Sequence, residues 1–89
     1  MKYIKTFEFF NTSRTLFATL DTLKRGSRCI IKGIESDIAP QLLSMGIIIG
    51  EEVEVENIAP LGDPMIISCG SNRVSIRKSD ARKIRVLVK

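Results

Sequence analysis

The chain has 89 residues, of which 44% are hydrophobic and 27% are charged, and its formal net charge is +4. A chain of this length forms one small domain with a modest core, which leaves little room for a buried active site. It contains no histidine, so it lacks both the commonest metal ligand and the side chain that usually titrates near neutral pH. These properties argue against an enzyme and against a metal centre.

Nothing in the sequence predicts a membrane span, because no stretch approaches the roughly 18 apolar residues that a spanning helix needs. The apolar residues near the N-terminus are interrupted by Glu8, Asn11 and Arg14, which breaks the continuous apolar core of a signal peptide. We therefore expect a cytoplasmic protein. Cys29 and Cys69 each lie in an apolar, strand-like run, which predicts small core residues rather than a disulfide or a metal-binding pair.

Residues 1–19 differ from the rest and are interpreted as an N-terminal extension. Every aromatic residue of the chain lies here: Tyr3, Phe7, Phe9, Phe10 and Phe17. The alternation from Lys5 to Phe9 predicts a short strand, and Thr12 or Ser13 is expected to cap a helical turn through Leu16 and Phe17. The extension either folds back over the domain or docks onto another chain. Folding back is favoured, since exposed phenylalanines promote aggregation.

The regular part of the chain begins near Leu20, and Gly26 marks a turn into a strand at 27–35. Ile31 and Ile34 have opposite parity in this strand, and Gly33 lies between them. A glycine at a change of parity predicts a β-bulge. A bulge bends a strand, as a small closed barrel requires.

The segment 36–46 has the pattern of a helix of about two turns. Ser36 or Asp37 is the expected N-cap, because its side chain can accept a hydrogen bond from a free amide of the first turn. Gly46 is the expected left-handed C-cap. The apolar residues at helical spacing, which should face the core, are Ile38, Leu42 and Met45.

Four further strands and a brief helical turn follow. Val53 and Val55 alternate with glutamates, which indicates an antiparallel strand with one buried face. A turn at 59–64, a hairpin turn at 70–72 and a helical turn capped by Ser79 separate the later strands. The apolar residues expected to point inward in those strands are Met65, Ile67, Cys69, Val74, Ile76, Ile84, Val86 and Val88. About five short strands, with one short helix between the first two, predict an all-β fold in the form of a small barrel.

Four sequence motifs occur in a fixed order. They are LDTLKRG at 20–26; Leu42 with Met45, Gly46 and Ile47, followed by Gly50; APLGDP at 59–64; and IRKSDA at 76–81. This series resembles the FeoA family, the small ferrous iron transport protein A of prokaryotes, over about residues 20–88. The resemblance departs from the family in two places. Ile49 stands where the family usually has proline, and residues 1–19 precede the usual start of the family core.

The resemblance implies an SH3-like barrel over 20–89 that acts in the cytoplasm with FeoB, the ferrous iron permease that carries its own GTP-binding domain. FeoB is the expected partner, and through it the protein would lie at the inner face of the membrane. The family is not regarded as enzymatic, and no cofactor is expected. Related barrels also occur in iron-dependent repressors. The residues themselves leave open whether the barrel forms a homo-oligomer.

The two glycines around the isoleucine run are interpreted as turn residues. A membrane-helix seam is excluded by length, and a phosphate loop would precede a helix, whereas Gly46 follows one. The residues expected to form structural turns are Gly26, Gly46, Gly50, Gly62 and Pro64.

Without histidine, the usual Ser–His and Cys–His nucleophile pairs are missing. The alternating glutamates are expected to be a solvated face, because general acid catalysis needs a sheltered carboxyl group with a perturbed pKa. No metal-binding residue is predicted. The link to iron therefore rests on the resemblance alone.

The barrel segment has no aromatic residue, so recognition of proline-rich peptides is not expected. The candidate partner-binding residues are Ile48, Leu61, Asp63, Arg77 and Lys78. Ile48 is chosen because Ile47 and Ile49 cannot both share its side of the chain, although a single exposed apolar residue is also common. Leu61 lies at the tip of a proline-stiffened turn, where a leucine more usually tucks onto the core.

Basic residues gather toward the C-terminus, at Arg73, Arg77, Lys78, Arg82, Lys83, Arg85 and Lys89. A nucleic-acid-binding or repressor-type barrel is the alternative function that they suggest. Single-strand binding surfaces use aromatic platforms, which are missing here, so no nucleic acid is expected. A solvated face, or a surface that meets an acidic partner or membrane headgroups, is favoured.

Overall fold

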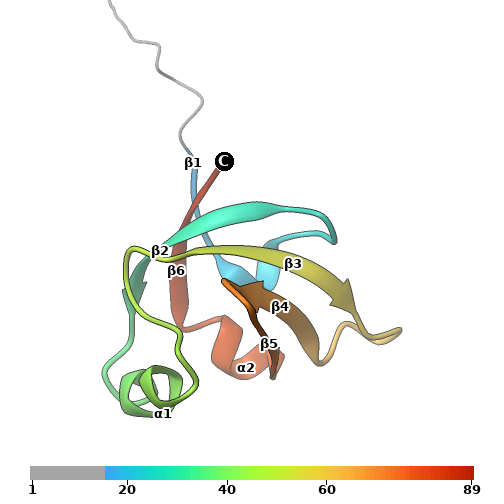
Figure 1. Ribbon diagram of the computed structural model, residues 1–89. Helices are drawn as coiled ribbons and strands as arrows, with labels where there is room; N and C mark the ends of the chain where they lie inside the picture. The colour runs from blue at the N-terminus through green and yellow to red at the C-terminus, as the bar shows by residue number, and fades with distance from the viewer. Residues whose placement is uncertain (1–15) are drawn as a thin grey trace, which may run out of the picture.

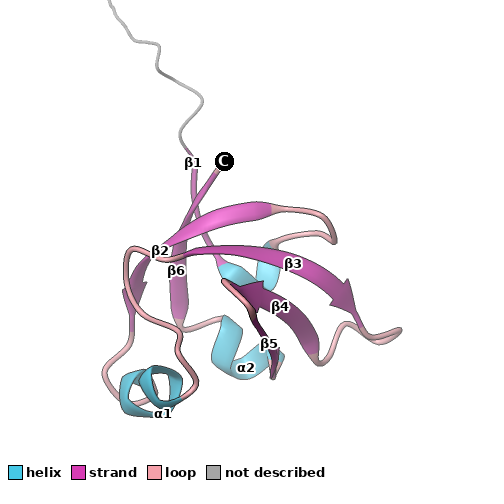
Figure 2. Ribbon diagram, in the orientation of Figure 1, coloured by secondary structure: helices cyan, strands magenta, loops and turns pink. Residues whose placement is uncertain are grey.

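The computed structural model describes residues 16–89 and shows one strongly bent antiparallel sheet with two short helices (Figures 1 and 2). The expected strand from Lys5 to Phe9 and the expected caps at Thr12 and Ser13 lie outside the described residues. The elements are β1 (Leu16–Thr19), the 3-10 helix η1 (Leu20–Thr22), β2 (Arg28–Ile34), α1 (Ala39–Ser44), β3 (Glu52–Ile58), β4 (Met65–Cys69), β5 (Asn72–Ile76), α2 (Lys78–Ala81) and β6 (Ile84–Val88). No helix within residues 16–89 has the length and apolar character to cross a membrane.

The strand order is β1-β6-β2-β3-β4-β5, and every pairing is antiparallel. The predicted all-β class is confirmed, as is the position of α1 between β2 and β3. The strand number differs from the prediction of about five, because β1 adds a sixth strand at one edge of the sheet.

The prediction of a helical turn through Leu16 and Phe17 is wrong. Leu16 pairs with Val88 and Phe17 with Leu87, so both residues belong to β1 at the edge of the sheet. The free edge of β6 offers a row of backbone donors and acceptors, and pairing with it outweighs the weak local preference of this segment for a turn. Both side chains remain largely exposed.

The predicted bulge in β2 is confirmed, because the register against β6 shifts between Ile31 and Gly33. A Cβ atom on Gly33 would stand 2.9 Å from the guanidinium of Arg85, so the glycine also makes room for that side chain. A second register shift lies in β3 between Val55 and Asn57. It was not predicted, since no glycine marks it.

The C-terminal end of α1 is built as predicted, whereas its N-terminal end is not. The amide of Gly46 donates to the Leu43 carbonyl (3.0 Å) and the amide of Ile47 to the Leu42 carbonyl (2.9 Å). With Gly46 at φ +85°, this pair of bonds forms a Schellman motif. The N-cap is Ile38, with no side-chain cap.

Ser36 and Asp37 therefore do not cap α1. The Asp37 carboxylate forms an ion pair with Lys83 instead. The N-cap of α2 is likewise Arg77 rather than the predicted Ser79, and Asp63, from the β3–β4 loop, accepts the amide hydrogen of Lys78. Both corrections involve a side chain from a distant part of the chain. Lys83 pairs with the Asp37 carboxylate, and Asp63 accepts the amide hydrogen at the start of α2.

The core lies inside the bend of the sheet and matches the predicted inward faces. Its buried residues are Leu20, Cys29, Ile31, Ile38, Leu42, Ile47, Val53, Val55, Met65, Ile67, Cys69, Ile76, Ala81, Ile84 and Val86. Met45, Val74 and Val88 pack against it while partly exposed. Both cysteines are buried and unbonded, as predicted.

Candidate protein-binding surfaces

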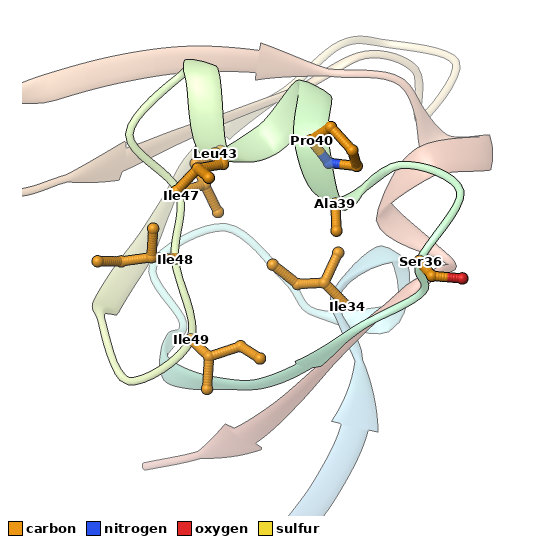
Figure 3. A pocket seen from close by; sticks show the side chains of 8 residues that line it. All are labelled: Ile34, Ser36, Ala39, Pro40, Leu43, Ile47, Ile48 and Ile49. Carbon is orange, nitrogen blue, oxygen red and sulfur yellow. The ribbon is translucent and has the colours of Figure 1, made fainter.

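An open apolar groove of about 490 Å³ lies between α1, the end of β2 and the loop that joins α1 to β3 (Figure 3). We call it the α1 groove. Its lining residues are Ile34, Ser36, Ala39, Pro40, Leu43, Ile47, Ile48 and Ile49. Ile34 and Ala39 point into the space, whereas the hydroxyl of Ser36 points away from it (Figure 3). The groove therefore presents hydrocarbon almost throughout.

Backbone hydrogen bonds force two of the three isoleucines outward. Ile47 enters the core behind α1 and is 1% exposed. The chain then turns, with the Glu51 amide donating to the Ile48 carbonyl (3.2 Å), and the Gly50 amide ties the turn to Ile31 of β2 (2.8 Å). Ile48 begins this turn and Ile49 lies at its corner, and the two side chains are 41% and 61% exposed.

The α1 groove includes Ile48 from the predicted set, together with residues that the sequence analysis did not choose as partner-binding candidates. The most exposed of these are Leu43, at 63%, and Ile49. The sequence did contain a signal for Leu43. Leu42 faces the core, and adjacent helical residues point about 100° apart, so the second leucine had to leave the inward face.

A second surface lies at the β3–β4 loop, residues 59–64, where Leu61 is 95% exposed. The interpretation that Leu61 tucks onto the core is wrong. The Gly62 amide donates to the Ala59 carbonyl (2.7 Å), which closes a turn with Pro60 and Leu61 at its corner. The Ala59 amide donates to the Pro64 carbonyl (3.0 Å) and closes the loop behind that turn. Leu61 is therefore held at the tip, away from the core.

The five candidate partner-binding residues do not form one surface. Asp63 accepts a hydrogen bond from the backbone of Lys78 (2.8 Å), which gathers Leu61, Asp63, Arg77 and Lys78 at one end of the molecule. Ile48 lies near the beginning of β3 and the loop follows its end. Seven residues of strand separate the two places, about 23 Å at 3.3 Å per residue. Figure 1 shows α1 and the β3–β4 loop at opposite ends of the sheet.

The predicted turn residues hold these surfaces in place. Positive φ angles occur at Gly26 (+89°), Gly46 (+85°), Gly50 (+97°) and Gly62 (+87°). Gly50 ends the turn that exposes Ile48, and Gly62 ends the turn that exposes Leu61. A left-handed residue is needed at each point where the chain reverses, and glycine adopts that conformation without a steric cost.

Most of the basic residues near the C-terminus are paired. Ion pairs join Arg73 to Glu56, Arg82 to Asp21, Lys83 to Asp37 and Lys89 to Glu52. The hydrogen bond with Lys83 lowers the pKa of the Asp37 carboxyl, and the same bond raises the pKa of Lys83. Four of the seven basic residues are thus neutralised locally, so they do not form a continuous positive face.

Neither cysteine in the described part of the chain has the character of a reactive thiol. Burial raises the pKa of the Cys29 thiol to about 11, and nearby Glu52 adds to the effect. Burial, and then Glu51, raises the pKa of Cys69. Both thiols are therefore protonated and unreactive at neutral pH. Residues 16–89 contain no group of three or more acidic or cysteine side chains placed to hold a metal ion.

A family model, the FeoA domain, matches residues 18–88, which is most of the chain. The chain belongs to the FeoA family. This family is associated with ferrous iron transport and is not a known enzyme family. The match confirms the resemblance found in the four sequence motifs.

Solved FeoA structures share the fold. One, described as the iron uptake regulatory protein FeoA, is 28% identical over 83% of this chain and 99% of its own, with a TM-score of 0.75. The FeoA-like protein of Clostridium acetobutylicum is 33% identical over 82% of this chain and 85% of its own (TM-score 0.71). FeoA of Stenotrophomonas maltophilia in complex with zinc is 27% identical over 78% of this chain and 88% of its own (TM-score 0.66). It is described as an SH3 domain protein, which supports the predicted SH3-like barrel.

A manganese-dependent transcriptional repressor (16% identity) and IdeR of T. acidophilum (22% identity) also share the fold, and this likeness concerns the fold alone. No curated protein sequence matches the chain.

Proposed function

We propose that this FeoA-family chain is an accessory protein of ferrous iron uptake that binds the cytoplasmic part of the permease FeoB through the α1 groove. The family membership supports the link to ferrous iron transport. The observation that carries the choice of surface is the exposure of Leu43, Ile48 and Ile49 around one open apolar groove.

The groove has the physical character of a protein-binding surface. It is open and lined by aliphatic side chains, and none of its lining residues is charged. When an apolar side chain of a partner enters such a groove, the apolar surfaces of both proteins are removed from water, and this burial stabilises the complex. The turn at Ile48 is fixed by hydrogen bonds to β2, so little conformational entropy is lost when a partner binds.

The alternative, a nucleic-acid-binding or repressor-type barrel, gains no support from the electrostatics. Four of the C-terminal basic residues form ion pairs with acids of the same chain. Fewer cations are then free to replace counterions on a phosphate backbone. A gel-shift titration at physiological salt should show no binding to DNA or RNA at micromolar protein, whereas salt-sensitive binding would favour the alternative.

Complementation of a deletion strain tests the proposed function. Cells that lack this gene should take up less ferrous iron under iron limitation, and the wild-type chain should restore uptake. Leu43→Asp should fail to restore it, because a charge in the groove would have to be buried against the partner. Gln41→Asp is the matched control, since Gln41 is exposed in the same helix and does not line the groove.

Two results would contradict the proposal. Uptake that is unchanged by the deletion would remove the link to transport. Full restoration by Leu43→Asp would show that transport does not need the groove.

A further inference from the structure

The β3–β4 loop presents one apolar side chain on a fixed support. Leu61 is 95% exposed, and the proline residues Pro60 and Pro64 flank it. Two backbone hydrogen bonds close the loop, and a third bond joins Asp63 to the first residue of α2. The loop thus holds the Leu61 side chain in water in the folded chain, where it buries almost no apolar surface.

One cation lies against this loop, and a second one precedes that cation in the sequence. A Cβ atom on Gly62 would stand 3.5 Å from Nζ of Lys78, so the ammonium group lies against the loop. Arg77 precedes Lys78, and both residues are exposed. Neither forms an ion pair within residues 16–89.

Two more cations lie at the same end of the sheet. Lys24 and Arg25 occupy the turn before β2, and the amide of the next residue, Gly26, donates to the Val55 carbonyl at the middle of β3 (2.8 Å). This turn and the β3–β4 loop lie on the same side of the sheet (Figure 1). Both side chains are exposed, and neither is ion-paired within the described range. Together with Arg77 and Lys78, they make four positive charges. The acids of the loop and of α2 are two, Asp63 and Asp80.

We propose that this end of the molecule contacts an anionic lipid bilayer, with Leu61 entering the headgroup region and the four cations meeting lipid phosphates. A protruding aliphatic side chain with exposed cations on the same side of the molecule fits a soft, negatively charged surface. A protein partner would need a preformed pocket that receives Leu61, whereas a bilayer accepts a protruding aliphatic side chain without one. The contact is distinct from the α1 groove and does not depend on the proposed function of that groove.

Flotation with lipid vesicles tests the proposal on the full-length chain. Vesicles of phosphatidylcholine with phosphatidylglycerol should bind the protein, and those of phosphatidylcholine alone should not. Binding should weaken as NaCl is raised from about 50 to about 500 mM, because salt screens exposed charges. Residues 1–15 contain apolar and basic residues of their own. The decisive comparison is therefore between variants that share this segment.

Leu61→Ser should lower the vesicle partition coefficient at least about fivefold, because the aliphatic side chain is lost from the headgroup region. Lys78→Gln should lower it about fivefold, the contribution of one cation near an anionic surface. It leaves the bond to Asp63 in place, since that bond uses the backbone amide. Ile48→Ser, at the far end of β3, is the control and should bind as the wild type does.

The proposal is overturned if the wild-type chain does not bind anionic vesicles at low salt. It is also overturned if Leu61→Ser binds as strongly as the wild type, which would mean a purely electrostatic contact without insertion. Loss of permease binding in Lys78→Gln, without any vesicle binding by the wild type, would assign the surface to an acidic protein instead.

Discussion

Oδ1 of Asp63 accepts a hydrogen bond from the backbone amide of Lys78 at 2.8 Å, across fifteen positions of sequence. This contact joins the β3–β4 loop to the first turn of α2, a helix that has no side-chain cap of its own. It gives Asp63 a structural role, and it places Leu61 beside the cations of α2. The arrangement of that end of the molecule follows largely from one carboxylate.

Asp63→Ala should lower the free energy of unfolding by about 1 kcal/mol, because the helix amide then loses its acceptor. Asp63→Asn keeps a side-chain oxygen and should recover most of the loss. Urea denaturation measures both. Equal destabilisation by the two variants would show that the charge, rather than the hydrogen bond, is what matters.

Ile49→Pro should stabilise the protein by about 0.4 to 1 kcal/mol. Ile49 precedes Gly50, which has φ +97°, in a turn closed by the Glu51 amide and the Ile48 carbonyl. Proline is common before such a glycine, and the Ile49 amide donates no backbone hydrogen bond within residues 16–89. This turn gives a physical reason for proline at the position where the sequence departs from the family. Ile49→Ala is the control for loss of the side chain, and destabilisation by proline alone would contradict the turn geometry.

Gly46→Ala should cost about 1 to 2 kcal/mol, because a residue with a Cβ atom is strained at φ +85°. A Cβ atom there also comes within 3.1 Å of the Asn72 side-chain amide. Gly26→Ala has a similar φ and no neighbouring atom within 4 Å, so it measures the strain alone. Thermal unfolding should rank Gly46→Ala as the more destabilising. The reverse order would mean that Asn72 moves aside without cost.

The stability of the protein should fall as the pH rises from about 9 to about 11. The folded chain keeps the Cys29 thiol protonated up to its pKa of about 11, whereas an ordinary thiol deprotonates near 9.0. Over this range the unfolded chain binds fewer protons than the folded chain, so the free energy of unfolding decreases with pH. Cys29→Ala should flatten that slope, whatever its overall stability. An unchanged slope in the variant would assign the pH dependence to other groups, such as Lys83.

The sequence was most informative where one short segment decides the structure. Val53 and Val55 alternate with glutamates because an antiparallel strand with one wet face has a period of two, and the structure buries both valines. Gly33 marked its bulge because the parity of the apolar residues changes there. Gly46 marked the end of α1 for an equally local reason.

Features that depend on distant partners were not predictable in this way. β1 forms because its residues pair with β6, as Leu16 does with Val88, and no local sequence pattern predicts that pairing. The Asp37 side chain does not cap α1, because it binds Lys83, forty-six positions away in the sequence. The α1 groove needs α1, β2 and the following loop together, so the sequence did not predict it as one surface.

Calorimetric titration of the cytoplasmic domain of FeoB into the full-length chain tests the central claim most directly. Wild type and Gln41→Asp should bind with the same affinity, whereas Leu43→Asp and Ile48→Asp should each weaken binding at least about tenfold, which corresponds to about 1.4 kcal/mol. Circular dichroism should show that all four proteins are folded. If both groove variants bind like the wild type, the α1 groove is not the surface that meets the permease.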